Sequence, residues 1–384
     1  MSSVSEALRV HGPEYLRRLP VTAATVPIRK AFGAIMRCRT GELGVVRWQC
    51  ARCQRRHWTG RSCGNRHCPT CGQEKTNAWI KRQQAKLMPG VHHFMITFTV
   101  PQPMRDVMHR HRREGYSALM AASADAIRLV ASATRELKDC ELGFFGVLHT
   151  WGRDPMVYHP HVHYVVPGGG VTVDEAGQAT GWKSTSPGFF VHHGTLVRVY
   201  KAKLADQLRS RGLYDLVPSA AWQKKFVVDI QAVDSGRSVV DYLAPYVHRV
   251  AISNHRVVDV AAQSVTYQYK PTGSDRLETR TVSGQQFAAG LAQHILPTGL
   301  RKVRHHGWMS NHSRVSPEEV RMLVWAVLGW VYWMASGHAP RQTDPKPNPP
   351  RCRVCGSPMR VTRVIDRPLN VDALNRAVAY QDTG

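Results

Sequence analysis

The stretch His159-Pro-His161-Val-His163-Tyr-Val-Val-Pro-Gly-Gly-Gly170 decides the fold predicted for this chain. Successive side chains of a β-strand point to opposite faces, so His161 and His163 share one face. Their Cα atoms would lie about 6.6 Å apart, close enough for both imidazoles to bind one metal ion. Val162, Val165 and Val166 indicate the buried side of the strand, and the glycines end it. A His-x-His also arises by chance among 20 histidines, so other features must support the metal site.

The charge of the chain indicates a polyanionic partner. Its 384 residues include 52 Lys and Arg against 27 Asp and Glu, a net charge of +25. A folded protein this basic attracts nucleic acid, and 43% apolar residues exclude a disordered chain. A charge that serves only solubility is the plainer alternative. A membrane-surface role is disfavoured because no long basic amphipathic helix is evident.

Nothing in the sequence predicts a membrane span or secretion. The longest apolar run, residues 322–335, has 14 residues, whereas a bilayer needs roughly 20. Ser316-Pro-Glu-Glu319 before it is a helix start with a capping box, which predicts one buried or interface helix over 317–336. No secretory signal opens the chain, and its nine cysteines cluster at metal-like spacings. We therefore expect a cytoplasmic protein.

The coarse pattern predicts an α+β fold. Strands are expected at 93–100, 142–151, 157–166 and 225–231, and a pair of strands within 252–269. Helices are expected within 1–37 and at 73–87, 104–138, 196–211, 239–250 and 285–296, with a hairpin or loop at 171–194 and a linker at 340–350. These elements suggest a central antiparallel sheet with helices on one face.

Cysteine pairs in the N-terminal part predict zinc. Cys50-x2-Cys53 and Cys68-x2-Cys71 are 14 residues apart, and two such pairs can form one tetrahedral thiolate site. Further ligand-type residues in the region are Cys63, the strongest of them, and His57, Cys38 and His67. They could hold a second ion or lie on a polar surface. Arginines in the same module suggest phosphate contacts: Arg52, Arg55, Arg56 and Arg66.

The spacing alone leaves two interpretations for each of two further motifs. Cys352-x2-Cys355 is half a zinc site, completed from elsewhere in the chain, or simply two thiols. Tyr242-Leu-Ala-Pro-Tyr246 places two phenols on one face of a helix, where they can serve one site or be ordinary packed aromatics. A phenol can attack a phosphodiester when a divalent ion polarises the phosphate. Mg²⁺ or Mn²⁺ is the expected ion at His161 and His163.

Taken together, the motifs resemble the HUH single-strand endonucleases, and most closely the two-tyrosine rolling-circle transposases of the IS-ninety-one insertion-sequence family. The resemblance covers roughly residues 10 to 315. It rests on Cys38-Arg-Thr40, Cys63-Gly-Asn-Arg-His-Cys-Pro-Thr-Cys71, Phe98-Thr-Val-Pro101, His149-Thr-Trp151, His159-Pro-His-Val-His163, the segment from Tyr242 to Asn254, and Leu296-Pro-Thr-Gly-Leu300 through Gly307.

The resemblance implies a role for each matching residue. His161 and His163 would hold the catalytic divalent ion, and Tyr242 and Tyr246 would each take the 5′ phosphate of a cut single strand. The partners would be single-stranded element ends and target DNA in the nucleoid of a bacterium. Relatives differ in the third metal ligand. His159 is too far along the strand to join His163, so Asp154 is favoured slightly over His149.

The resemblance also divides the chain. Residues 1–88 would form a helical and zinc-binding DNA-recognition domain, residues 89–310 the endonuclease domain, and residues 311–384 a helical C-terminal part. Three alternatives remain. A replication initiator or conjugative relaxase shares the chemistry. A zinc hydrolase would use His161 and His163 without a covalent DNA adduct. A non-enzymatic, zinc-dependent DNA-binding protein would lack the reaction.

Overall fold

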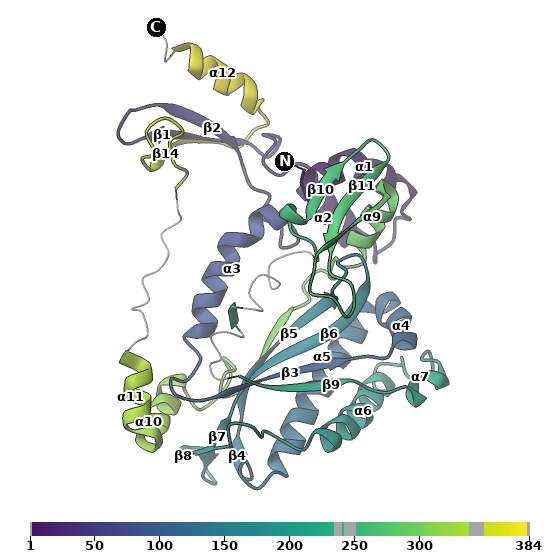
Figure 1. Ribbon diagram of the computed structural model, residues 1–384, viewed down its shortest axis with the longest axis vertical. Coiled ribbons are helices and arrows are strands. Elements are labelled where there is room, and N and C mark those ends of the chain that lie inside the picture. The colour runs from purple at the N-terminus through teal and green to yellow at the C-terminus, as the bar shows by residue number, and fades with distance from the viewer. Residues whose placement is uncertain (1, 234–239, 242–250, 338–348, 382–384) are drawn as a thin grey trace.

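A five-stranded antiparallel sheet forms the centre of the computed structural model, which describes residues 2–233, 240–241, 251–337 and 349–381 (Figure 1). Its strand order is β13-β5-β6-β3-β9. The strands are β3 (His93–Thr99), β5 (Gly143–Trp151), β6 (Tyr158–Pro167), β9 (Val228–Val233) and β13 (Val303–Gly307). The α+β class and the antiparallel central sheet are thus confirmed. The strand β13 was not predicted.

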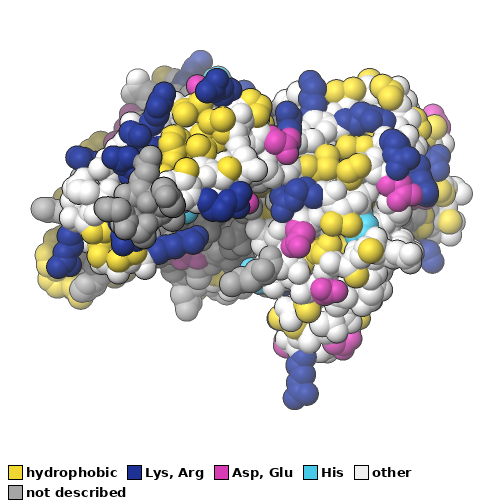
Figure 2. All heavy atoms as spheres, turned by 90° about the horizontal axis from the view of Figure 1, so that it is seen from above, with side chains coloured by type: hydrophobic (Ala, Val, Ile, Leu, Met, Phe, Trp, Pro, Cys, Tyr) yellow, Lys and Arg dark blue, Asp and Glu magenta, His cyan; other side chains and the backbone are white. Residues whose placement is uncertain are grey.

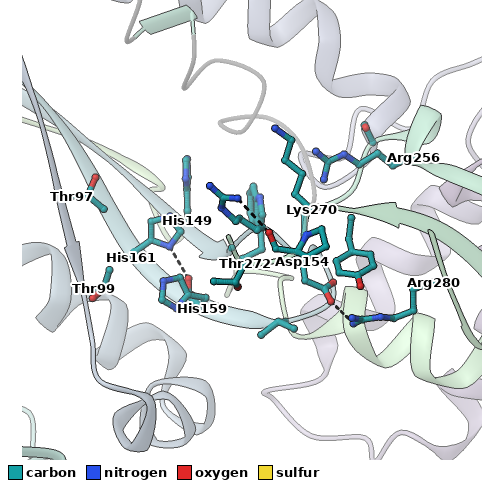
Figure 3. A pocket seen from close by; sticks show the side chains of 18 of the residues that line it. Thr97, Thr99, His149, Asp154, His159, His161, Arg256, Lys270, Thr272 and Arg280 are labelled. Carbon is teal, nitrogen blue, oxygen red and sulfur yellow. Dashed lines mark hydrogen bonds and ion pairs between the residues drawn. The ribbon is translucent and has the colours of Figure 1, made fainter. Parts of the chain in front are cut away.

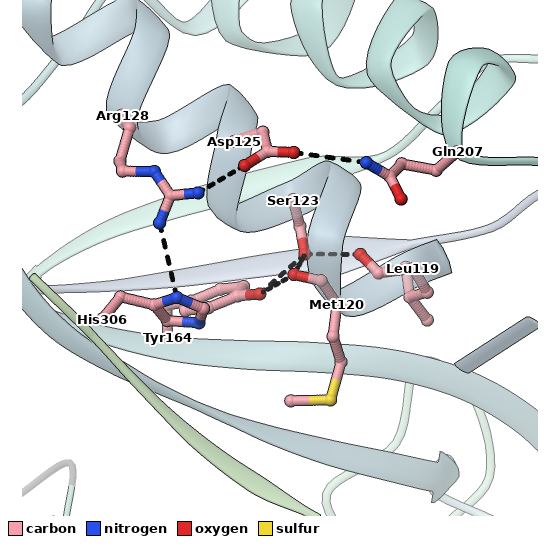
Figure 4. Close-up of polar contacts among 8 residues, drawn as sticks. All are labelled: Leu119, Met120, Ser123, Asp125, Arg128, Tyr164, Gln207 and His306. Atoms are coloured by element: carbon pink, nitrogen blue, oxygen red, sulfur yellow. Dashed lines mark hydrogen bonds and ion pairs between the residues drawn. The ribbon is translucent and has the colours of Figure 1, made fainter. Parts of the chain in front are cut away.

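Two helices, α5 (Arg112–Ser132) and α6 (His193–Arg209), cover one face of this sheet. Phe98, Phe144 and Tyr164 pack beneath them in the largest apolar core. The buried Tyr164 hydroxyl donates to the carbonyl of Met120 at 2.9 Å and lies 2.8 Å from the Ser123 hydroxyl (Figure 4). A buried hydroxyl with partners fixes how the helix sits on the sheet.

The predicted single helix over 104–138 is wrong. It is divided into η1 (Gln102–Met104), α4 (Arg105–Arg110) and α5. The break lies at His111, whose φ of −112° and ψ of 54° are not helical. Apolar periodicity continues across such a break, so the sequence pattern does not reveal it.

The opposite face of the sheet carries the histidines and is covered in part by α3 (Pro69–Gln84). Trp79 of α3 packs with Phe145, Val147 and Val165. Val165 therefore lies on the histidine face, whereas Val162 lies on the other, as strand alternation requires. The prediction that Val162 and Val165 share one buried side is wrong, because both faces of this strand are buried.

A second, smaller sheet lies beside the central one. The sheet β10-β11-β12 consists of β10 (Val257–Val260), β11 (Ser264–Tyr269) and β12 (Glu278–Ser283). It packs with the helices α1 (Val4–Arg18), α2 (Val26–Met36) and α9 (Gly284–Ala292) in one apolar core. The predicted strand pair within 252–269 is confirmed. The third strand, β12, was missed.

The two ends of the chain meet in a third sheet. The strand β1 (Val45–Cys50) pairs with β2 (Arg56–Gly60) on one side and with β14 (Met359–Ile365) on the other. The helix α12 (Val371–Gln381) follows β14, and its Asn375 exchanges two hydrogen bonds with the backbone of Trp58 in β2. Residues 351–381 thus lie on the N-terminal module, across the predicted boundary between residues 310 and 311 (Figure 1).

The remaining elements lie at the periphery. A small sheet joins β4 (Cys140–Glu141), β7 (Gly169–Val173) and β8 (Ala179–Ser184), which confirms the expected hairpin. The short elements α7 (Ser219–Gln223) and η2 (Asn254–Arg256) lie in connections. The predicted helix at 239–250 and linker at 340–350 fall mostly outside the described residues.

The predicted helix over 317–336 begins as expected at Ser316, with its capping box to Glu319, but it is two helices. The helix α10 (Pro317–Leu328) ends at Gly329, whose φ of 47° favours glycine, and α11 (Trp330–Gly337) follows. Among the described residues, no helix is long and apolar enough to cross a membrane.

Candidate functional site

Three imidazoles converge on the histidine face of the central sheet. His161 and His163 come from β6, and His149 comes from β5, directly opposite His161 in the strand register. One nitrogen from each of the three rings lies within 4.8 Å of the other two, and all three side chains are buried. The alternation predicted from the sequence therefore brings its two histidines together, and the antiparallel pairing adds a third.

Hydrogen bonds orient two of these rings. Nδ1 of His161 donates to the carbonyl of His159 at 2.7 Å. Nδ1 of His163 lies 2.8 Å from Oγ1 of Thr97, on the neighbouring strand β3. Each bond leaves Nε2 as the ring atom for a metal, because metal-bound histidines commonly use the other nitrogen for an oxygen partner. The rings are thus held in one orientation before any ion binds.

Burial keeps the three imidazoles neutral, the form that binds metals. Burial lowers the pKa of His163 to about 4. It also lowers the pKa of His149 and of His161 well below the ordinary value, with a further contribution from the neighbouring histidines. A protonated ring has no lone pair for an ion, so this environment favours a metal site at neutral pH.

The structure groups His149, and not Asp154, with His161 and His163. Its carboxylate accepts a hydrogen bond from the Tyr267 hydroxyl at 3.3 Å and pairs with Arg280, and it caps the turn by accepting from the backbone N–H of Met156 at 2.9 Å. In Figure 3, Asp154 is directed to Arg280, whereas His149 and His161 lie next to each other. Asp154 connects the turn after β5 to the β10-β11-β12 sheet, whereas His149 lies with His161 and His163.

The three histidines line a cavity of about 1180 Å³. The β10-β11-β12 sheet and the residues beside it form the opposite wall (Figure 3). Among the described residues that line it, Asp154 is the only carboxylate, against five cations: Arg105, Arg153, Arg256, Lys270 and Arg280. Lys and Arg are also spread over the face of the molecule seen in Figure 2, with few acidic side chains between them. Such a cavity attracts a phosphate backbone.

The two predicted nucleophiles, Tyr242 and Tyr246, lie outside the described residues. The residues on either side of that segment are described. Val240 is buried with Val147 and Val165 on the histidine face, and Asp241 accepts a hydrogen bond from Gln84 of α3 at 2.9 Å. Ala251, at the other end, lines the histidine cavity. Both ends of the segment are therefore on the histidine side of the sheet.

Eight of the described cysteines form two groups of four, whose members differ from the set predicted for one site. Cys38, Cys63, Cys68 and Cys71 are together, with sulfur separations of 3.4 Å for Cys38–Cys71, 3.6 Å for Cys63–Cys71 and 3.7 Å for Cys38–Cys68. A tetrahedral zinc site with Zn–S bonds near 2.3 Å places its sulfurs about 3.8 Å apart. The group matches that geometry.

Cys50 and Cys53 are in the other group, with Cys352 and Cys355. The single site predicted from Cys50, Cys53, Cys68 and Cys71 is therefore wrong. The two pairs lie on opposite sides of the β1–β2 hairpin and are not brought together. Neither His57, within β2, nor the buried His67 belongs to a cysteine group.

The predicted arginines also separate. The guanidinium of Arg66 donates to the carbonyls of Leu300 and Pro297, each at 2.8 Å. It therefore joins the zinc-binding part to the loop before β13. Exposed side chains on the β1–β2 hairpin remain the candidates for DNA contact: Arg52, Arg55 and Arg56.

Sequence reasoning missed Thr97, Arg105 and Lys302. The Lys302 ammonium lies 4.6 Å from the centroid of the Trp151 ring, which stacks on His149 at an interplanar angle of 15°. Burial lowers the pKa of Lys302 to about 7. Thr97 directly precedes the Phe98-Thr-Val-Pro101 motif, but only the pairing of Thr97 with His163 across β3 and β6 reveals its position beside the histidines.

Comparisons with known proteins define the class as a transposase. The family described as "Putative transposase" matches residues 143–316, which include the three histidines, and the family "Transposase zinc-binding domain" matches residues 7–100. The putative transposase y4qJ of Sinorhizobium fredii is 31% identical over 331 residues, 81% of each chain. The transposase for insertion sequence element IS801 of Pseudomonas savastanoi pv. phaseolicola is 27% identical over 369 residues, 89% of this chain and 84% of its own.

The chain therefore belongs to the IS91 family of transposases, with an N-terminal zinc-binding domain. No solved structure matches it significantly. The resemblance inferred from the motifs is confirmed at this level. A transposase cuts and joins DNA, so the predicted partner class is confirmed as well.

Proposed function

We propose that this transposase nicks and rejoins single-stranded DNA through a covalent 5′-phosphotyrosine, in metal-dependent rolling-circle transposition in the bacterial cytoplasm. The observation that carries the proposal is the convergence of three buried, neutral imidazoles in a cavity that is otherwise cationic. Residues 89–310 would form the catalytic unit. Cys38, Cys63, Cys68 and Cys71 would hold the zinc of the N-terminal domain, and Arg52, Arg55 and Arg56 would contact DNA.

His149, His161 and His163 would hold the catalytic ion. A divalent ion there would polarise the scissile phosphate and offset the charge that develops on it. Nitrogen-only protein ligands suit Mn²⁺ better than Mg²⁺, which prefers carboxylates and water. Of the two ions expected from the sequence, we therefore favour Mn²⁺.

The cations of the cavity would position the strand. Arg105 lies beside His159 and His161, and Arg256 and Lys270 lie on the opposite wall. Phosphates bound by both walls would place one phosphodiester over the histidines. Tyr242 or Tyr246 would then attack that phosphorus. A bond forms between the phenol oxygen and phosphorus, and the bond to the 3′ oxygen breaks, which leaves a free 3′ hydroxyl.

The covalent bond would preserve the energy of the phosphodiester, so that rejoining needs no ATP. In the reverse step, a 3′ hydroxyl of another strand attacks the phosphotyrosine and releases the phenol. Two tyrosines would allow one strand to be held while a second is cut. The anchoring of Val240 and Ala251 on the histidine side supports this assignment.

The test is adduct formation with single-stranded oligonucleotides from the ends of the element and Mn²⁺, resolved on a denaturing gel. We expect an adduct that is lost with EDTA, in His161→Ala and in the double variant Tyr242→Phe/Tyr246→Phe. Tyr269→Phe is the matched control, because this tyrosine lines the same cavity and its hydroxyl bonds Glu278 at 3.2 Å. An adduct in the double variant would refute the assignment of the nucleophiles.

One observation favours the zinc hydrolase alternative: three histidines lie together, and three histidines are a common ligand set of catalytic zinc. It predicts cleaved DNA with no protein–DNA adduct, and highest activity with Zn²⁺. A replication initiator or relaxase would form the same adduct, but the family match to transposases disfavours both. The adduct gel with a series of metals therefore separates the remaining alternatives.

A further inference from the structure

Two cysteine pairs from opposite ends of the chain meet beside the β1–β2 hairpin. The sulfur separations are 3.4 Å for Cys50–Cys355, 3.6 Å for Cys53–Cys352 and 3.6 Å for Cys53–Cys355. These values lie far above the S–S bond of a disulfide, about 2.05 Å, and near the edge of a tetrahedral zinc–thiolate site, about 3.8 Å. The four sulfurs form one compact group, although 298 residues of the sequence lie between Cys53 and Cys352.

The backbone around each pair has the shape of a metal-binding turn. The N–H groups of Arg52 and Cys53 both point to Sγ of Cys50, at 3.4 Å each. In the other pair, the Gly356 N–H donates to the carbonyl of Cys352 at 2.9 Å, and Gly356 has a φ of 69°, which favours glycine. Hydrogen bonds from N–H groups stabilise a thiolate, the form that binds metal.

This part of the fold has little else to stabilise it. Among the described residues, the apolar cluster around the four thiols contains the buried Cys50, Cys352 and Met359, with Trp48 partly buried beside them, and the rest of the sheet adds the buried Val45 and Trp58. Three strands with so small a core need another source of stability, and a structural metal is the common one in small modules. The other cysteine group differs here, because Cys38 and Cys68 are part of a larger apolar core with α1, α2 and α9.

We propose that Cys50, Cys53, Cys352 and Cys355 bind a second structural zinc ion, which joins the C-terminal segment to the N-terminal zinc-binding domain. Cys352 and Cys355 lie outside the residues 7–100 that the zinc-binding family matches. The site is independent of the phosphotyrosine chemistry proposed above. With this second zinc site, the DNA-recognition module contains residues from both the N-terminal and the C-terminal part of the chain. It can therefore fold completely only after residues 351–365 have been synthesised.

A redox disulfide is the competing use of two Cys-x2-Cys pairs. It would need only one pair and would place two sulfurs at bonding distance. Here all four sulfurs share one group, and Arg351, Arg353 and Arg360 add exposed charge to the same module, as expected of a DNA-binding surface. The ninth cysteine, Cys140, belongs to neither group and serves as a control.

The first test is titration of the metal-free, full-length protein with Co²⁺, whose thiolate charge-transfer absorption reports sulfur ligands and not the histidine site. We expect two equivalents of Co²⁺ to bind as tetrathiolate in the natural protein and in Cys140→Ser. One equivalent would overturn the proposal, and this outcome does not depend on whether a variant folds.

The second test uses zinc content, measured by mass spectrometry after removal of loosely bound metal. Cys352→Ser/Cys355→Ser should contain one zinc ion fewer than Cys140→Ser. Cys355→His should restore the content, because histidine is a zinc ligand. Equal zinc content in all three variants would refute the proposal. A double serine variant that misfolds loses both ions, and the number of Co²⁺ equivalents bound by the natural protein, which needs no variant, then decides between one site and two.

A third test concerns the joining of the two ends. A protease site inserted between residues 337 and 349 allows the purified protein to be cut, with the C-terminal piece carrying β14 and α12. We expect the piece to co-elute with the rest of the chain and to be released by a strong zinc chelator. Retention after the thiolate absorption has been lost would show that zinc does not hold the segment.

Discussion

The substitution Thr97→Val tests whether the metal site depends on the ring orientation described above. Its hydroxyl lies 2.8 Å from Nδ1 of the buried His163. If His163 binds the ion through Nε2, its Nδ1–H donates to this hydroxyl, and valine removes the acceptor at nearly constant volume. Leaving a buried donor without a partner costs about 1–3 kcal/mol. Metal affinity should fall about 5- to 150-fold, in line with the roughly 10- to 100-fold effect of outer-shell partners elsewhere.

The chain offers a matched control two residues away. Thr99 lies on the same face of β3 and lines the same cavity, but its hydroxyl donates to the carbonyl of Val227 at 3.2 Å. Thr99→Val therefore makes the same chemical change without altering a histidine. Mn²⁺ affinity should stay within about 2-fold of the natural protein, because the only bond lost is one near the sheet edge.

The assay is Mn²⁺ binding followed by electron paramagnetic resonance, with adduct formation as a function of Mn²⁺ concentration as a second readout. A true orientation effect weakens both in parallel, and saturating Mn²⁺ restores the adduct. Unchanged affinity in Thr97→Val, or an equal loss in Thr99→Val, would refute the role assigned to this hydrogen bond.

Three further predictions concern the same face of the molecule. His149→Gln should abolish saturable Mn²⁺ binding, which metal titration measures. Asp154→Asn should keep the Mn²⁺ affinity but lower the melting temperature by a few degrees in calorimetry, because the side chain loses its ion pair with Arg280. The opposite result for the two variants would support Asp154 as the ligand. Arg105→Ala and Arg256→Ala should each make the affinity for single-stranded DNA less dependent on salt, with the slope of log affinity against log salt concentration reduced by about 0.7. Arg276→Ala, at an exposed position, is the control. Slopes equal to that of the natural protein would exclude phosphate contacts by Arg105 and Arg256. The buried His93 has a pKa lowered to about 4, so the unfolded chain, with its histidine pKa near 6.5, binds an extra proton between pH 6.5 and 4. The free energy of unfolding should therefore fall as the pH drops through this window, by about 1.4 kcal/mol per pH unit for this group, and His93→Phe should remove that share of the slope in urea denaturation.

Alternation along one strand was enough to predict two of the three histidines of the candidate metal site. His161 and His163 share a face because side-chain direction in a strand depends only on local geometry. His149 could not be ranked in the same way. Its position depends on the register between β5 and β6, which is set by packing across the sheet and not by the residues near His149. Asp154 was favoured for its chemistry, yet an ion pair with Arg280, more than a hundred residues away, determines where it points.

The cysteines show the same limit at longer range. Spacing identified each Cys-x2-Cys as a half site, since only two residues separate the two cysteines and this keeps their thiols close together. Which half sites combine depends on how the chain returns, and β14 returns to β1 from more than 300 residues away. The breaks at His111 and Gly329 were missed because apolar periodicity continues through them; they are set by backbone conformation, which the pattern of apolar residues does not record.

The arrangement separates the part of the site that must be rigid from the part that must exchange strands. The three histidines lie on β5 and β6, two strands in the interior of the five-stranded sheet, where His149 pairs with His161 and His163 pairs with Val147 and Thr97. The rings of His163 and His161 are oriented by Thr97 and by the carbonyl of His159, respectively, before an ion binds. The tyrosines come from a different segment, whose ends at Val240 and Ala251 rest on the same face. In the mechanism proposed above, a phosphate held over an ion at the preformed histidine site would meet either phenol without any change in the metal ligands, as alternate cutting and rejoining of two strands would require.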